Sequence, residues 1–264
     1  MGRINYSRRR FLHGSVLSFG GLIVAGCDKL GESPSFRRTL ESAEALTLRG
    51  QRLLIGGQAL AREFSVADIS PTFRSNGTSL PADRLYQRLL QDQFASWRLD
   101  VDGRVQRPAS YSLTELKALP SRTQITRHDC VEGWSAIGRW QGVPLALLLQ
   151  ASGIEADARY VVFHCADTYG GTPHKGGDER SGRYYESIDL IDAFHPQTIL
   201  AYSLNGTELP VENGAPLRLR VERQLGYKQA KYVMRVEVTT RLDLIGSGKG
   251  GFWEDRGYEW YAGI

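Results

Sequence analysis

The spacing of hydrophobic and polar residues predicts β-strands along most of the chain. Three segments alternate in the manner of strands with one exposed face, and one short apolar run is typical of a buried strand. The alternating segments are 97–101, 217–222 and 232–239, and the apolar run is 160–164. Asp102-Gly103 directly follows the first segment and predicts a two-residue hairpin turn there.

Two short helices are indicated by their terminal residues. Ser112 and Glu115 have the capping-box spacing and predict a helix that runs through Leu119. The segment 144–153 has Pro near its start and Gly at its end, the usual asymmetry of a helix. Strands outnumber helices and do not alternate regularly with them. The pattern therefore predicts an α+β domain with mixed β-sheets.

Composition and charge place the chain among ordinary globular proteins. Of 264 residues, 41% are hydrophobic and 23% are charged, enough apolar material for a sizeable core. The formal charge of +4 comes from residues 1–26, which hold four arginines and no acid. The remaining chain has 33 − 4 = 29 basic residues against 29 acidic ones. Net charge therefore gives no reason to expect nucleic-acid binding.

The first 26 residues have the order of features found in a signal peptide. Segment 7–13, Ser-Arg-Arg-Arg-Phe-Leu-His, resembles the twin-arginine export motif, and an uncharged run, 14–26, follows. Thirteen helical residues span about 20 Å, short of a bilayer's hydrocarbon core. We expect a protein exported in its folded state to the periplasm. The alternative is a basic tail before a short core helix.

The residues after the apolar run indicate a lipid anchor. Val24-Ala-Gly-Cys27 resembles a lipobox, and Asp28 implies retention at the inner membrane. The alternative is cleavage without lipidation. We expect a signal peptide over 1–26, a tether and N-terminal extension over 27–69, helical in part over 39–48, and an oxidoreductase domain over 70–264.

Two cysteines remain once Cys27 is assigned to the lipobox. Cys130 and Cys165 could form a disulfide, or one could bind a metal while the other is buried. A thiolate suits a soft transition metal, and Arg127 and His128 are expected to lower the pKa of Cys130. By composition alone, Cys130 would be a structural cysteine.

Several separated motifs resemble the sulfite oxidase family over about residues 70–264. The similarity is greatest to the branch with the catalytic subunit of the periplasmic protein-methionine-sulfoxide reductase. Cys130-Val-Glu-Gly-Trp-Ser135, followed by Gly142-Val-Pro-Leu145, resembles the family's molybdenum-ligand segment. Other matching motifs are Tyr160-Val-Val-Phe163, Tyr185-Glu186, His195-Pro196, Asn213-Gly-Ala-Pro-Leu-Arg218 and Gly226-Tyr-Lys-Gln-Ala-Lys231.

This resemblance implies a molybdenum-molybdopterin cofactor with Cys130 as its metal ligand and catalytic residue. The implied cofactor-binding residues are Asn76, Cys165, Asn213, Arg218, Gln229, Ala230 and Lys231. Cys165 stands where the related reductase has threonine, and Asn76 could instead belong to an Asn-Gly turn. Arg218 and Lys231 suit the cofactor's phosphate, but they could also be exposed charges on strands.

The same resemblance implies two-electron chemistry, with oxygen-atom transfer on an S-oxide substrate. The sequence has no Cys-x-x-Cys-His motif, so electrons are expected to pass to or from an external haem protein or cytochrome. The alternatives are a sulfite dehydrogenase, or a cofactor-free binding protein on the same fold with a Cys130–Cys165 disulfide. The loop 170–183 is expected to be solvated or to contact an anionic substrate. A monomer is expected.

Overall fold

The computed structural model describes residues 33, 35, 43, 46–53, 56–169 and 182–264. The chain divides into two compact units, Met1–Leu54 and Ile55–Ile264. Residues 46–53 of the first unit are helical. The predicted signal peptide, the lipobox, most of segment 27–45 and segment 170–181 lie outside the described residues. Within the described part of the chain, no helix has the length and apolar character needed to cross a membrane.

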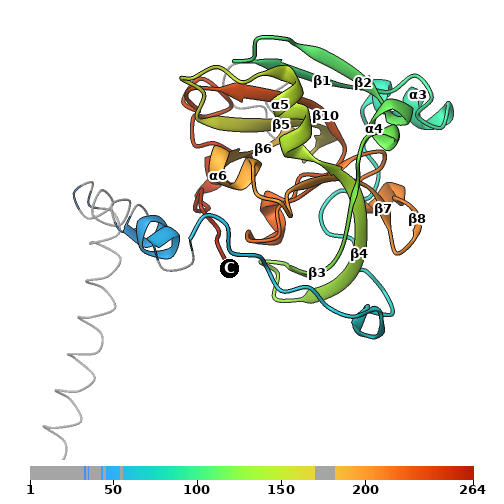
Figure 1. Cartoon of the computed structure of the whole chain (residues 1–264), viewed down its shortest axis with the longest axis horizontal. Coiled ribbons are helices and arrows are strands. Elements are labelled where there is room, and N and C mark those ends of the chain that lie inside the picture. Colours follow the sequence, from blue (N-terminus) through green and yellow to red (C-terminus); the bar gives the residue numbers. More distant parts are fainter. Residues whose placement is uncertain (1–32, 34, 36–42, 44–45, 54–55, 170–181) are drawn as a thin grey trace, which may run out of the picture. The chain divides into compact units, whose positions relative to one another are not determined.

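The second unit contains a five-stranded mixed sheet, shown in Figure 1. Its strand order is β2-β1-β10-β5-β6, and only the β1–β10 pair is parallel. The strands are β1 (Arg98–Gly103), β2 (Ala109–Ser112), β5 (Tyr160–Thr168), β6 (Arg183–Asp189) and β10 (Val233–Thr239).

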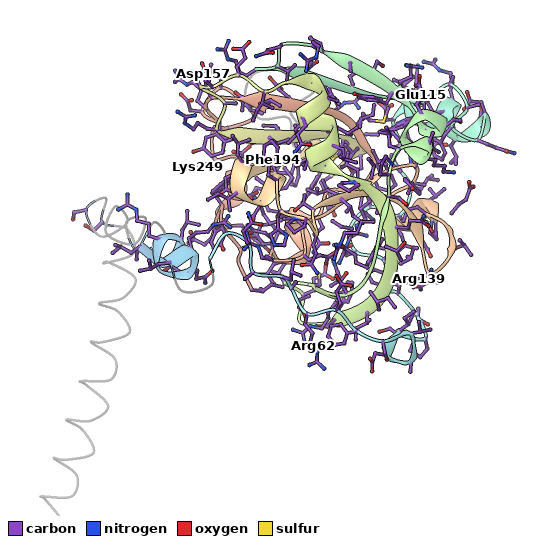
Figure 2. The ribbon with its side chains drawn as sticks, in the orientation of Figure 1. Arg62, Glu115, Arg139, Asp157, Phe194 and Lys249 are labelled. Carbon is purple, nitrogen blue, oxygen red and sulfur yellow. The ribbon has the colours of Figure 1, made fainter. Side chains whose placement is uncertain are left out.

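An antiparallel second sheet is built around the long, curved pair β3 and β4, drawn in green in Figure 1. Its order is β3-β4-β7-β8, and β9 pairs with β7. The strands are β3 (Arg122–Asp129), β4 (Ser135–Pro144), β7 (Ile199–Leu204), β8 (Thr207–Glu208) and β9 (Arg218–Arg220). Along β4, exposed residues such as Arg139, labelled in Figure 2, alternate with buried ones such as Trp140. The two sheets and the short helices confirm the α+β class with mixed sheets.

Short helices connect the strands. They are α3 (Arg84–Gln91), α4 (Leu113–Ala118), α5 (Leu145–Ser152) and α6 (Leu190–Ala193), with 3-10 turns η1 (Val66–Asp68), η3 (Val211–Asn213), η4 (Gly226–Lys228) and η5 (Glu254–Arg256). The Ser112–Glu115 capping box forms as predicted, because the Ser112 N–H donates to the Glu115 carboxylate at 2.7 Å (Figure 2). Helix α5 ends at Gly153 with a φ of 64°, the left-handed conformation that glycine favours.

The two-residue turn predicted at Asp102-Gly103 is wrong, although β1 and β2 do pair antiparallel through a longer connection. Strand β1 continues through Gly103, which pairs with Val238 of β10, and the antiparallel partner β2 begins only at Ala109. Gly103 is nevertheless required, because its φ is +85° and an added Cβ would lie 2.2 Å from the Val238 carbonyl oxygen.

The expectation that segment 217–222 exposes one face is also wrong. All three residues of β9 are buried. Arg220 forms a fully buried ion pair with Glu222 at 2.6 Å, and its guanidinium lies 4.3 Å from the Trp140 ring centroid. The charged positions of this alternating pattern therefore face other protein groups and not solvent.

The compact unit begins before the predicted boundary at residue 70. The Phe64 N–H donates to the Ile125 carbonyl at 2.8 Å, and the Ser70 N–H donates to the Ile137 carbonyl at 3.0 Å. These two hydrogen bonds attach residues 64–70 to both β3 and β4. The main apolar core lies between the sheets and α5, around Leu99, Leu148, Val162 and Val236.

Candidate active site

A pocket with a volume of about 120 Å³ lies beside the turn that joins β3 to β4. Four residues predicted from the sequence line it together, although they are far apart along the chain. These are Asn76, Cys130, Gln229 and Lys231.

Cys130 is held by a tight turn at the end of β3. Its N–H donates to the Trp134 carbonyl at 2.9 Å, and the Gly133 N–H donates to the Cys130 carbonyl at 3.0 Å. Gly133 has a φ of +84°, which few other residues adopt. The cysteine is 8% exposed, and burial raises the pKa of its thiol, while the positive charge of Arg218 partly offsets the rise.

The two residues expected to lower the pKa of Cys130 do not do so. The Arg127 side chain turns to the Asp129 carboxylate, 2.9 Å away. His128 is fully buried, and burial together with Arg218 lowers its pKa, so its ring is neutral at pH 7. Its Nε2 has no hydrogen-bond partner among the described residues.

Arg218 is a buried cation with free donors. Its Nη1 donates to the Asn213 carbonyl at 3.1 Å, whereas Nε and Nη2 have no partner in the described part of the chain. Burial, reinforced by the nearby Arg220, lowers the pKa of this guanidinium to about 9. The alternative of an exposed strand charge is therefore wrong for Arg218. An anion beside it would compensate the buried charge.

Lys231 is buried too, but its hydrogens are already committed. Its Nζ donates to the carbonyls of Asn76 at 2.7 Å and Glu212 at 2.8 Å, and also to the Thr78 carbonyl. Burial, together with the charge of Arg218, lowers the pKa of the ammonium to about 7. Lys231 thus fastens the segment 75–78 to the turn before β9, and it is not an exposed charge either.

Three predicted amide side chains also present unpartnered buried atoms. Within the described residues, Asn76 Oδ1, Asn213 Nδ2 and Gln229 Oε1 have no hydrogen-bond partner. Buried polar atoms are normally satisfied, so such a cluster indicates a bound polar group. The free donors of Arg218 and Asn213 suit a phosphate, and the free acceptors of Asn76 and Gln229 suit ring N–H groups. The residues therefore fit a phosphorylated heterocycle such as molybdopterin.

Four predicted cofactor residues are not among those that line this pocket, namely Cys165, Asn213, Arg218 and Ala230. Cys165 is buried in β5 opposite Val233 and borders a second cavity, and its thiol and that of Cys130 are both free. The disulfide required by the cofactor-free alternative is thus absent between these two described cysteines. Ala230 is buried, and its carbonyl accepts a hydrogen bond from the Leu219 N–H at 2.8 Å.

Two carboxyl groups of the pocket were missed from the sequence. Glu132 is exposed at its edge, and its Oε2 accepts a hydrogen bond from the Trp134 indole at 3.0 Å. Asp167 is 2% exposed, and burial raises the pKa of its carboxyl to about 6. No motif marks Asp167, because it lies on a strand whose predicted extent ended at residue 164.

Aromatic side chains form one wall of the pocket. Trp253 and Tyr258 stack with their centroids 5.3 Å apart, and Tyr227 meets Tyr258 edge-on at 5.2 Å. Tyr169 and Tyr184 also line the pocket and contact each other. Most of this surface comes from the C-terminal segment and from the ends of β5 and β6.

A single cysteine beside buried, unpaired donors and acceptors is what a cofactor-binding pocket requires. The family model described as "Oxidoreductase molybdopterin binding domain" matches residues 87–243, and the chain belongs to this family. It is an enzyme of the sulfite oxidase family and binds molybdopterin.

Similar proteins carry reductase names. "Putative protein-methionine-sulfoxide reductase subunit YedZ1" of Azospira oryzae is 37% identical over 97% of this chain and 88% of its own length. The protein-methionine-sulfoxide reductase catalytic subunit MsrP of Xanthomonas axonopodis pv. citri is 32% identical over 89% of this chain and 70% of its own. Among solved structures, the sulfane dehydrogenase SoxCD of Paracoccus pantotrophus matches with a TM-score of 0.46 and 21% identity, over 55% of this chain and 38% of that one.

Proposed function

We propose that this enzyme reduces S-oxides by two-electron oxygen-atom transfer, with a molybdenum-molybdopterin cofactor whose metal is bound by Cys130. The observation that carries the proposal is the Cys130 thiol in a pocket ringed by unpaired buried polar atoms. When bound, the molybdenum centre supplies the oxygen-atom transfer and the change of two electrons. A soft thiolate suits such a metal.

Different residues of the chain would bind different parts of this cofactor. Arg218 and Asn213 would bind the phosphate through their free N–H groups, and Asn76 and Gln229 would accept from the pterin. Lys231 would act mainly by holding Asn76 in place. Ala230, through its backbone, and Cys165 remain predicted cofactor contacts.

The pocket suits a neutral sulfoxide better than sulfite. Its aromatic wall offers rings to a polarisable sulfur group, as thioethers prefer. The exposed carboxyl group of Glu132 would repel an anion, and the ammonium of Lys231 already donates its hydrogens to carbonyl groups. The names of the relatives point the same way. The sulfite dehydrogenase alternative would need a cationic pocket.

Two serine variants test the metal assignment. Cys130→Ser should keep its fold and most of its pterin but lose turnover, because a hard ligand replaces a soft one. Cys165→Ser is the comparison and should have only a mild effect on metal content and activity. An active Cys130→Ser enzyme, or equal loss in both variants, would refute the assignment. Metal analysis, pterin content and turnover of methionine sulfoxide against sulfite are the measurements.

We also propose that the enzyme is a monomer and that it exchanges electrons with an external haem protein.

We propose that the protein is exported by the twin-arginine pathway and anchored to the inner membrane by a lipid on Cys27. Changing Arg8 and Arg9 to Lys should trap folded protein in the cytoplasm. Labelled fatty acid should enter the natural chain but not Cys27→Ala. Periplasmic accumulation of the first variant, or an unmodified N-terminus in the natural protein, would contradict these assignments.

A further inference from the structure

Asp167 is a buried carboxyl group in the reaction pocket. It lies near the end of β5 and lines the same pocket as Cys130, yet it is only 2% exposed. Its Oδ1 has no hydrogen-bond partner among the residues that the structure describes. A buried, unpaired carboxyl oxygen is costly unless it carries a proton or meets a ligand.

The surroundings of Asp167 favour its neutral form. Burial is the largest influence and raises the pKa of the carboxyl to about 6, whereas the facing ammonium of Lys231 and, more weakly, hydrogen bonds from the Asp167 backbone and from the Thr78 side chain oppose the rise. That ammonium is itself bonded to the carbonyls of Asn76 and Glu212. The other titratable groups that face Asp167 are the Tyr86, Tyr169 and Tyr232 hydroxyls and the Cys165 thiol.

The chemistry proposed above consumes protons. Reduction of a sulfoxide breaks the sulfur–oxygen bond and releases the oxygen as water, so the balance is R₂SO + 2H⁺ + 2e⁻ → R₂S + H₂O. The two electrons come from the external one-electron donor. A general acid beside the departing oxygen would supply one of the two protons, and such groups typically accelerate reactions about 10²- to 10⁴-fold.

We propose that Asp167 is this general acid: its carboxyl group donates one proton to the departing oxygen and is reprotonated from solvent. The second proton comes from solvent directly. The inference rests on the proposed sulfoxide chemistry. Glu132 is the competing carboxyl group in the pocket, but it is exposed and already accepts a hydrogen bond from Trp134. Because it is buried, Asp167 keeps its proton at a pH at which an ordinary aspartate has lost it.

The first test compares holoenzyme variants in sulfoxide reduction as a function of pH. Wild-type turnover should fall as pH rises through about 6. The turnover of Asp167→Asn should be about 100-fold lower at pH 6, with unchanged pterin and molybdenum content. Its pH profile should also lack the fall near pH 6, which is called the limb below. Asp100→Asn, an exposed change on β1, is the matched control and should behave as wild type.

The second test is independent of turnover. In ¹³C-labelled protein, one carboxyl resonance should titrate near pH 6 and be missing in Asp167→Asn. An unchanged pH profile in Asp167→Asn, loss of pterin from that variant, or removal of the limb by Glu132→Gln instead would overturn the inference while the proposed function stands. A loaded wild-type enzyme that reduces no sulfoxide would overturn both.

Discussion

The ammonium group of Lys231 donates a hydrogen bond to the backbone carbonyl of Asn76, 2.7 Å away and 155 positions distant in the sequence. Together with its bonds to the Thr78 and Glu212 carbonyls, this contact ties segment 75–78 to the rim of the pocket. The side chain therefore positions one predicted cofactor residue, while its own hydrogens are occupied.

Replacing Lys231 by methionine should loosen segment 75–78. The change leaves three carbonyl oxygens without their donor, and we expect the free energy of unfolding to fall by about 1–3 kcal/mol. Amide hydrogen exchange in segment 75–78 should become faster. Lys117→Met is the control, because Lys117 only pairs with the exposed Glu208 and should cost less than about 1 kcal/mol. Equal stability and exchange in both variants would contradict this role.

Arg218→Met should have opposite effects on the protein with and without cofactor. The cofactor-free protein should be at least as stable as wild type, because an uncompensated buried charge is removed. Cofactor retention should fall about 10- to 150-fold, which corresponds to about 1.5–3 kcal/mol for charge-assisted bonds to a phosphate. Urea unfolding and released pterin measure the two effects.

Arg220→Met is the matched comparison for that prediction. Arg220 lies two residues away on the same short strand, but it is paired with Glu222. Removing it leaves a buried carboxylate unpaired, and we expect a loss of about 3–5 kcal/mol. If Arg218→Met destabilised the cofactor-free protein as much as Arg220→Met, the free donors of Arg218 would be structural and not a phosphate site.

Local signals predicted local structure well. The Ser112–Glu115 capping box and the Gly153 helix end depend on neighbouring residues only, so the sequence contains the full cause of each. The two-residue turn at Asp102-Gly103 was wrong because β10, more than 130 residues later, pairs with β1 and extends it. The exposed face of segment 217–222 was wrong because Glu222 and Trp140 compensate the Arg220 charge inside the fold.

The pocket could be predicted from sequence only in part. Family motifs predicted Cys130, Arg218 and Lys231 as site residues, but they assigned the two cations the same role, binding of the cofactor's phosphate. Their difference lies in distant partners, since carbonyl groups of segment 75–78 surround Lys231 whereas two nitrogens of Arg218 have no partner in the described chain. Asp167 carried no signal, because only tertiary burial distinguishes it from a surface aspartate.

The unfolding free energy of the cofactor-free protein should depend on pH through Asp167. Its pKa is about 6 in the folded protein, against 3.8 for an ordinary aspartate. Below about pH 3 the group is protonated in both states and contributes no pH dependence. As pH rises from about 4 to 6, the unfolded chain releases this proton first, so wild type should lose about 2 kcal/mol relative to Asp167→Asn, and the difference should then level off. Urea titrations of both proteins between pH 4 and 7 measure it, because carboxyl groups common to both chains cancel in the difference. Parallel stability curves would mean that Asp167 ionises as an ordinary surface carboxyl, and it would then hold no proton for catalysis near neutral pH.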